Sequence, residues 1–135
     1  MTSLLCDIVT PERQVFSEEV VSVSLPGTEG DFGILQRRAA MMSTLRPGEI
    51  RVQRAEGEEP LRFAVDGGYA ENDGSKVVVL ASRAVDISLL DAEEIARRRD
   101  RADQALAAAV ADDSRTAFLR SEAAWYTLLD RLLSR

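Results

Sequence analysis

The chain has 135 residues, of which 45% are hydrophobic, 5% aromatic and 30% charged, and its net charge is −6. This composition allows one modest core, but no basic block is present that would neutralise a phosphate backbone, which argues against nucleic acid as a partner. The chain contains no histidine and a single cysteine, Cys6, so histidine-based triads and an internal disulfide are excluded. No apolar run approaches twenty residues and no signal peptide is recognisable, so we expect a soluble protein.

The first 25 residues predict short antiparallel strands. Leu4 to Thr10 alternates, with Cys6 among the residues that point to one side, so Cys6 is interpreted as a small core residue. A second strand begins over Gln14 to Phe16, and Val20 to Leu25 forms a third with alternating valines. Apolar residues on alternate positions place one face of each strand in a core.

An acidic loop follows the third strand. Pro26 lacks a backbone donor, which predicts that the chain leaves the sheet ladder there. Gly27, Gly30 and Gly33 then punctuate an acidic stretch before an apolar strand resumes at Phe32. An ordinary hairpin loop of a β-sandwich is the simplest interpretation of this pattern by itself.

The next forty residues continue the meander. Pro47-Gly48 predicts a turn before a strand over Glu49 to Arg54, and a further strand runs from Leu61 to Val65. Asp66-Gly67-Gly68 predicts an interruption of that strand, where a bulge or a close backbone approach would fit, before the strand resumes at Tyr69.

The last predicted strand follows a hairpin signal. Asn72-Asp73-Gly74 is typical of a hairpin turn, and Lys76 to Ala81 is an apolar run that suits a strand buried on both faces. Turn signals at this frequency, with no long helical period before residue 88, favour an antiparallel sandwich or barrel.

From Ser88 the hydrophobic period becomes helical. Two capping-box patterns, Ser88 to Asp91 and Asp91 to Glu94, predict a helix that runs to about Val110. Asp112-Asp113-Ser114 is the predicted break and cap, and a second helix covers Arg115 to Arg135. The expected inward residues are Ile95, Ala102, Leu106 and Ala109 on the first helix, and Phe118, Trp125, Leu129 and Leu132 on the second, with Leu119, Tyr126 and Leu133 beside them.

The fold class predicted is therefore an all-β antiparallel sandwich over residues 1–87, followed by an α-helical hairpin over residues 88–135. The alanine-rich stripe of the first helix buries little area, which favours a detachable hairpin. A hairpin docked permanently as a cap on the sandwich is the alternative.

The chain offers little for catalysis. The glycines at 27, 30 and 33 lack the Gly-Lys-Ser/Thr of a phosphate loop and precede a strand rather than a helix. Adjacent carboxylates such as Glu18 and Glu19 lie in predicted turns and are interpreted as solvated surface. We predict a protein that is not an enzyme and has no cofactor and no metal site.

The run Pro26 to Leu35, PGTEGDFGIL, is followed by a small apolar segment, by Leu45-Arg46-Pro47-Gly48 and by Val65-Asp66-Gly67-Gly68-Tyr69. In order and spacing this pattern resembles the epsilon subunit of F-type ATP synthases, of the bacterial type. The resemblance covers nearly the whole chain. It implies a non-catalytic subunit of the central stalk (the rotor), which couples the gamma subunit to the c-ring during proton-driven ATP synthesis.

The resemblance also implies contact residues on the sandwich. The acidic loop of the family lies near the c subunits, so Glu29 and Asp31 are the expected c-ring contacts. The family stretch Pro-Gly-His-Ala-Pro-Leu-Leu corresponds to Gln36 to Met42, where this chain departs from it. In this segment Arg37, Arg38, Met41 and Met42 are the expected gamma contacts.

For the helical hairpin the resemblance implies inhibition of ATP hydrolysis through contact with the alpha and beta subunits. Residues 114–135 carry four basic and two acidic side chains, and Arg115, Arg120 and Arg131 are the expected inhibitory contacts. Some family members bind ATP through Ile/Leu-Asp-x-x-Arg-Ala, but here Glu94 and Ile95 replace the arginine and the alanine. We therefore predict weak or absent ATP binding.

By resemblance the protein is peripheral to the cell membrane on its cytoplasmic side, where only the complex attaches it to the membrane. The competing class is a free-standing adaptor, in which the sandwich binds a peptide or sugar and the hairpin serves dimerisation.

Overall fold

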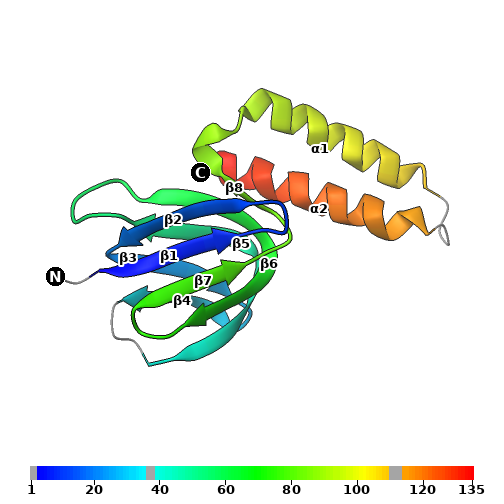
Figure 1. Cartoon of the computed structure of the whole chain (residues 1–135). Helices are drawn as coiled ribbons and strands as arrows, with labels where there is room; N and C mark the ends of the chain where they lie inside the picture. The colour runs from blue at the N-terminus through cyan, green and yellow to red at the C-terminus, as the bar shows by residue number, and fades with distance from the viewer. Residues whose placement is uncertain (1–2, 36–38, 110–113) are drawn as a thin grey trace. The chain divides into compact units, whose positions relative to one another are not determined.

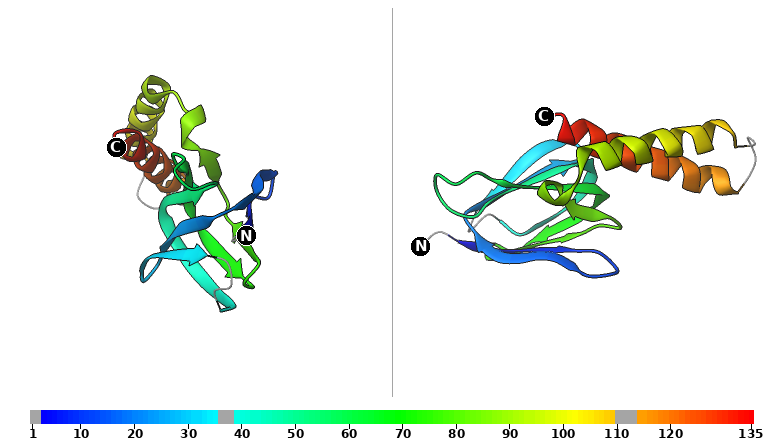
Figure 2. Two further views of the ribbon diagram at one scale, coloured as in Figure 1. Left: turned by 90° about the vertical axis from the view of Figure 1, so that its left-hand side faces the viewer. Right: turned by 90° about the horizontal axis from the view of Figure 1, so that it is seen from above.

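The structure is a computed structural model that describes residues 3–35, 39–109 and 114–135 (Figure 1). The chain divides into two compact units, residues 1–86 and 87–135. The first unit is a curled eight-stranded sheet and the second contains two α-helices; Figure 2 shows both units from two further sides. The predicted fold class, a β-sandwich followed by a helical hairpin, is confirmed.

The strand order in the sheet is β2-β1-β7-β6-β5-β3-β4, and β8 pairs with β6. One half of β6 pairs with β7 and the other half with β8, so this long strand belongs to both layers of the sandwich. All neighbours are antiparallel except β1 and β7, which are parallel. The strands are β1 Leu4–Val9, β2 Gln14–Val20, β3 Ser22–Gly27, β4 Gly30–Leu35, β5 Met41–Gln53, β6 Leu61–Asn72, β7 Lys76–Leu80 and β8 Ala84–Asp86.

The prediction that the chain leaves the ladder at Pro26 is wrong. Strand β3 continues through Pro26, which pairs with Asp31, and the turn consists only of Thr28 and Glu29. The predicted turn at Pro47-Gly48 is also wrong, because both residues lie within β5 and pair with β6. Residues 46–50 of β5 lie opposite residues 25–26 of β3, where the ladder between these strands is irregular. Both prolines therefore occupy a stretch in which a missing N–H is tolerated.

The glycine pair does not interrupt β6 as predicted, but the expected close backbone approach is confirmed. Gly67 and Gly68 have φ of 112° and 128°, and β6 stays in register with β5 on both sides of them. A Cβ atom at Gly68 would lie 2.1 Å from the carbonyl oxygen of Leu80. Gly68 therefore lets β6 and β7 approach more closely than any side chain would allow, while Gly67 lies against β5, where a Cβ would be 3.2 Å from the carbonyl oxygen of Leu45.

The hairpin predicted at Asn72-Asp73-Gly74 is confirmed. Gly74 has φ of 95°, and the carboxylate of Asp73 accepts hydrogen bonds from the backbone N–H groups of Ser75 and Lys76. Burial of β7 on both faces is wrong: Val77 and Val79 are buried, but Leu80 is 48% exposed and Val78 is half-buried. Only one face of β7 meets the core.

The core of the sandwich is built from alternate residues of the strands. Cys6 is fully buried, as predicted, and Phe16 and Phe63 pack with their ring centroids 5.3 Å apart. The remaining members are Leu4, Ile8, Val20, Val23, Leu25, Ile34, Leu45, Ile50, Val52, Val65, Ala70, Val77, Val79 and Ala81.

The second unit begins with a 3-10 turn, η1 (Ile87–Leu89), followed by α1 (Ala92–Ala107) and α2 (Arg115–Leu133) (Figure 1). Asp91 is the N-cap of α1, where its carboxylate accepts a hydrogen bond of 3.1 Å from the N–H of Glu93. Ser114 precedes α2 without a side-chain capping bond, contrary to the prediction. The predicted helix end at Val110 and the predicted break at Asp112-Asp113 lie outside the described residues.

The predicted apolar faces of the helices are confirmed in part. Ile95, Leu129 and Leu132 are buried, but Phe118 is 60% exposed. Phe118 lies in the first turn of α2, and the end of α1 that precedes the connection is rich in alanines. Phe118 is therefore not part of the buried face of α2, contrary to the prediction.

Candidate functional site

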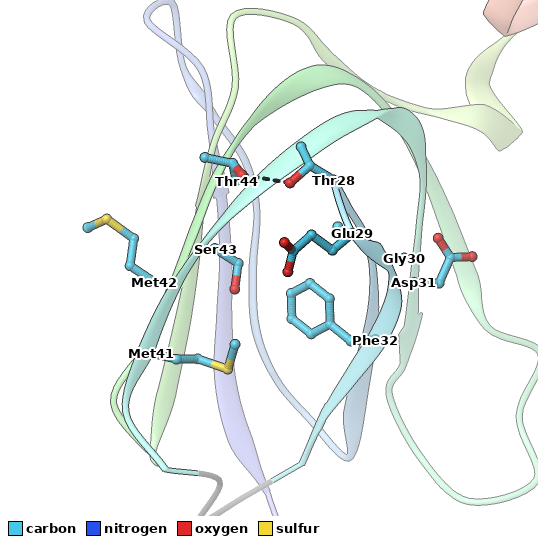
Figure 3. A pocket seen from close by; sticks show the side chains of 10 residues that line it. Thr28, Glu29, Gly30, Asp31, Phe32, Met41, Met42, Ser43 and Thr44 are labelled. Carbon is cyan, nitrogen blue, oxygen red and sulfur yellow. Dashed lines mark hydrogen bonds between the residues drawn. The ribbon is translucent and has the colours of Figure 1, made fainter.

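The turn between β3 and β4 forms one wall of an open pocket of 530 Å³, and the start of β5 forms the other. In Figure 3 the carboxylate of Glu29 points into the space between these walls, beside Phe32 and Ser43. Asp31 points away from it on the other side of the turn. The structure therefore brings both predicted acidic residues to one turn but directs them to different sides.

Asp31 has a specific partner that the sequence pattern did not reveal. The guanidinium of Arg46 on β5 binds the Asp31 carboxylate, and its second amino group donates to the carbonyl of Gly27 at 2.5 Å. The Thr28 and Thr44 hydroxyls also lie 2.8 Å apart across the same strands. These bonds tie the acidic turn to β5 and offset the charge of Asp31, whereas Glu29 forms no ion pair with a described residue. The turn is therefore anchored by polar contacts and presents one carboxylate to the pocket.

The predicted gamma contacts fall at the start of β5. Arg37 and Arg38 lie outside the described residues. Both methionines line the pocket, but Met41 is half-buried whereas Met42 is 68% exposed. The two methionines are thus neighbours that point to different surroundings, as expected for consecutive residues of a strand.

Met42 belongs to an exposed apolar surface on the outer side of the sandwich. It surrounds a hollow of 220 Å³ together with Tyr69, Val78 and Leu80, with Glu71 at the same hollow. We call Met42, Tyr69, Val78 and Leu80 the apolar face. Tyr69 pairs with Leu80 between β6 and β7, and these side chains are 55% and 48% exposed. A second hollow of 470 Å³ continues from Tyr69 and Leu80 to Val9 and Pro11.

Tyr69, Val78 and Leu80 were not predicted as contact residues. The signal that would have found them is the alternation within β7, where Val77 and Val79 point inward and Val78 and Leu80 therefore point outward. An uninterrupted apolar run hides this alternation. Apolar side chains gathered on an exposed sheet face mark a surface for contact with another protein.

The three predicted arginines lie along α2 and are all exposed. Arg120 and Arg131 are separated by eleven residues, about three helical turns, so they lie on the same face of the helix. Arg115 is five residues before Arg120, about 140° away around the helix axis. The structure therefore places two of the predicted residues together and the third elsewhere.

The residues that replace the ATP motif are engaged in local interactions. Asp91 caps α1, and Glu94 accepts hydrogen bonds from Arg98 at 2.8 Å and Arg97 at 2.7 Å. These bonds lower the pKa of Glu94 to about 2. Ile95 is buried. A carboxylate that stays ionised at the position of the motif arginine repels an anionic ligand.

No group of three or more residues capable of metal coordination is present among residues 3–35, 39–109 and 114–135. Neither α1 nor α2 has the length and apolar content that a helix needs to cross a membrane.

The fold and these surfaces define a β-sandwich that presents an apolar face and an anchored acidic turn, joined to a helical hairpin. Residues 3–87 match the family model described as the beta-sandwich domain of the ATP synthase delta/epsilon chain. The ATP synthase epsilon chain of Parvibaculum lavamentivorans is 44% identical over 113 residues, which cover 84% of this chain and 85% of that protein. The chain belongs to the ATP synthase epsilon chain family, which confirms the resemblance found in the sequence.

Further relatives agree in sequence and fold. The epsilon chain of Rhodospirillum rubrum is 37% identical over 123 residues, or 91% of both chains. A chain in the Euglena gracilis mitochondrial ATP synthase structure (OSCP/F1/c-ring) superposes with a TM-score of 0.76 at 20% identity, covering 97% of this chain and 81% of that one. A chain of the Tetrahymena thermophila central stalk/c-ring structure gives 0.59 at 14% identity, covering 96% of each chain. At these identities the two structures show similarity of fold alone.

Proposed function

We propose that the protein is a non-catalytic rotor subunit of an F-type ATP synthase, which couples the gamma subunit to the c-ring and restrains ATP hydrolysis through its helical hairpin. Membership of the epsilon chain family supports the proposal that the protein assembles into an F-type ATP synthase. The observation that carries the coupling role is the start of β5, where Met42 lines both the pocket at the acidic turn and the hollow of the apolar face. Two chemically different contact surfaces thus adjoin on one rigid sandwich.

The gamma subunit is the proposed partner of the apolar face. A contact that persists through rotation needs a stable, largely apolar core, and the exposed Met42, Tyr69 and Leu80 side chains supply one. Arg37 and Arg38 precede β5 in sequence, and together with Met41 they complete the proposed gamma contact.

The c-ring is the proposed partner of the acidic turn. Glu29 is directed into the open pocket, and Asp31 is held by Arg46 (Figure 3). Contacts through such polar groups and bridging water position two surfaces without requiring a large dry interface.

The helical hairpin is the proposed inhibitory element. The exposed Arg120 and Arg131 form a basic face on α2 that suits an acidic segment of the beta subunit, with Arg115 as a separate contact. Attraction between exposed opposite charges weakens with salt, so inhibition should decrease as ionic strength rises. In this assignment the protein is peripheral to the cell membrane on the cytoplasmic side, attached through the complex.

The test uses a catalytic core that lacks this subunit, prepared from the same organism. The full chain and a version ending at Ile87 are added, and co-elution and ATP hydrolysis are measured. Both versions are expected to bind, and only the full chain should inhibit. Binding without that difference would remove the inhibitory role, while failure of both versions to bind would favour the free-standing adaptor.

Variants separate the proposed contacts. Met42→Glu together with Tyr69→Glu should abolish co-elution, because charges would be buried without partners. Leu35→Glu is the matched control: Leu35 is similarly exposed, at 59%, but lies on β4 outside both hollows, so this variant should still bind.

Changing Arg115, Arg120 and Arg131 to glutamate should preserve binding and raise hydrolysis, and unchanged inhibition would contradict the assignment of these arginines.

A further inference from the structure

Within the helical hairpin, α1 contributes fewer buried residues than α2. Among the described residues of α1 only Ile95 is buried, whereas α2 buries Ala123, Leu128, Leu129 and Leu132. Alanines make up much of the remaining inward surface of α1, and alanine burial contributes little against the entropy of ordering two helices. Apolar packing therefore leaves the association of α1 with α2 weak, and polar contacts between the helices gain importance.

Two consecutive arginines of α1 reach across to α2. Arg99 Nη1 donates to Asp130 Oδ2 at 2.6 Å, and Arg98 Nη1 donates to the Tyr126 hydroxyl at 3.4 Å. Tyr126 and Asp130 are one helical turn apart and so lie on the same face of α2. The Asp130 carboxylate is only 28% exposed, which strengthens its attraction to the guanidinium relative to a fully solvated pair.

Arg99 is not satisfied completely by this arrangement. Its Nε atom is buried and has no hydrogen-bond partner among the described residues. Its Nη2 atom donates to Asp100 on the same helix at 3.2 Å, and the Asp100 side chain is 62% exposed. Arg99 therefore has one carboxylate across the hairpin and a second on its own helix that remains available when the helices separate.

From this geometry we propose that Arg99 and Asp130 form a reversible charge latch, which holds α1 against α2 and sets how readily the hairpin opens. In the closed hairpin the guanidinium binds both Asp130 and Asp100, but its Nε donor is buried and unpaired among the described residues. Opening would keep the Asp100 contact and expose the other donors to water. The unpaired donor thus offsets part of the stabilisation that the ion pair gives to the closed state. Because the latch is a property of the chain alone, it can fail while the rotor assignment holds, and the reverse is also true.

If the latch holds the hairpin closed, replacing one of its two partners and replacing both should have opposite effects on opening. Asp130→Asn leaves a partly buried guanidinium without its carboxylate and should open the hairpin. Replacing both partners, as in Arg99→Leu with Asp130→Leu, removes the charges and the unpaired donor together and should close it more firmly. Asp100→Asn removes a carboxylate from the same arginine without touching α2, so it is the matched control and should leave the hairpin closed.

The test measures the distance between the two helix ends in the full chain. Spin labels are attached to cysteines introduced at the exposed positions Ala92 and Arg135, and distance distributions are recorded by pulsed electron paramagnetic resonance. Burial of Cys6 raises the pKa of its thiol to about 12, so labelling near neutral pH spares it, and the wild-type chain checks this. Circular dichroism confirms that each variant remains helical.

We expect Asp130→Asn to raise the ratio of long-distance to short-distance populations about three- to tenfold. This range lies between the effects expected for losing an exposed ion pair and for losing a half-buried one. Salt at about 1 M should act in the same direction on the wild type and have little effect on the double leucine variant. Equal opening by Asp100→Asn would show that only net charge matters and would overturn the latch. Unchanged distances in Asp130→Asn, or opening of the double leucine variant, would overturn it as well.

Discussion

At the residue scale, Gly68 shows how a position without a side chain joins two strands. Its φ is 128°, a region that glycine enters at low cost, and a Cβ there would lie 2.1 Å from the Leu80 carbonyl oxygen and 3.1 Å from Ala81 Cα. Both obstructing atoms belong to the backbone and cannot rotate away. The close contact of β6 and β7 therefore depends on this glycine.

We predict that Gly68→Ala lowers the free energy of unfolding by about 2–4 kcal/mol, because backbone strain and steric overlap act together. Gly57→Ala is the control, since Gly57 also has positive φ but has nothing within 4 Å of an added Cβ. That variant should lose only about 1 kcal/mol. Urea unfolding followed by far-ultraviolet circular dichroism measures both, and equal losses would contradict the role of the close approach.

Glu49 is a second residue whose surroundings have a measurable consequence. Its side chain is 7% exposed and accepts hydrogen bonds from Arg62 at 2.7 Å and Arg51 at 2.6 Å. Burial raises the pKa of Glu49, but the hydrogen bonds from the two arginines outweigh burial and leave the pKa below its usual value of 4.5. A carboxylate with a depressed pKa stabilises the fold above its unfolded pKa, and this contribution is lost as the pH falls through the folded value.

Glu49→Gln should therefore cost about 1–3 kcal/mol near neutral pH, and the difference from the wild type should shrink as the pH falls below about 4.5. Urea unfolding at several pH values checks this. Glu58→Gln is the comparison, because Glu58 is 52% exposed and lies 3.9 Å from Arg54; its effect should be within about 0.5 kcal/mol at every pH. A pH-independent cost for Glu49→Gln would show that its charge is not involved.

At the scale of elements, the start of α1 uses its acidic residues locally. Asp91 serves as the N-cap, and Glu94 binds Arg97 and Arg98. Both carboxylates are thus committed to the helix itself, and the two arginines that could offset phosphate charge are held by Glu94.

We therefore predict that the chain shows no ATP binding at micromolar concentrations in titration calorimetry. Glu94→Arg restores the basic residue of the family run and frees Arg97 and Arg98 from their carboxylate, so this variant should bind more tightly than the wild type. Micromolar affinity of the unmodified chain, or loss of binding in Glu94→Arg, would contradict this account.

Strands β3 and β5 show where local patterns mislead at this scale. Pro26 and Pro47-Gly48 are turn signals, yet each lies inside a strand, because the ladder between β3 and β5 is irregular there. A proline removes one donor only, and whether that donor is needed depends on the neighbouring strand. That neighbour is not visible in the residues around the proline.

At the scale of the whole molecule, the main core cluster contains buried residues from Leu4 to Ala81 and none from α1 or α2. The sandwich therefore has its own core, and the predicted division into residues 1–87 and 88–135 is open to a direct test. A version ending at Ile87 should keep its β-sheet spectrum and unfold cooperatively, with a stability within about 1 kcal/mol of the full chain's sandwich transition. Loss of cooperative unfolding would show that the sandwich requires the hairpin.

The sequence by itself determined the two kinds of unit and the family. Alternation located the strands, the Asn72-Asp73-Gly74 signal located a hairpin, and capping at Asp91 located the first helix, since these features depend on residues close together in the chain. The acidic turn was also recognisable, because its glycines and carboxylates are contiguous.

Only the tertiary structure decided which side chains meet across the chain. The parallel pairing of β1 with β7, the exposure of Tyr69 and Leu80, and the bonds of Arg46 to Asp31 and of Arg99 to Asp130 all join residues distant in sequence. An arginine pattern does not reveal which carboxylate it will bind, because the partner is selected by strand register and helix packing. For that reason the sequence located the acidic turn and the methionines at the start of β5, whereas the apolar face that Tyr69, Val78 and Leu80 form with Met42 became visible only in the tertiary structure.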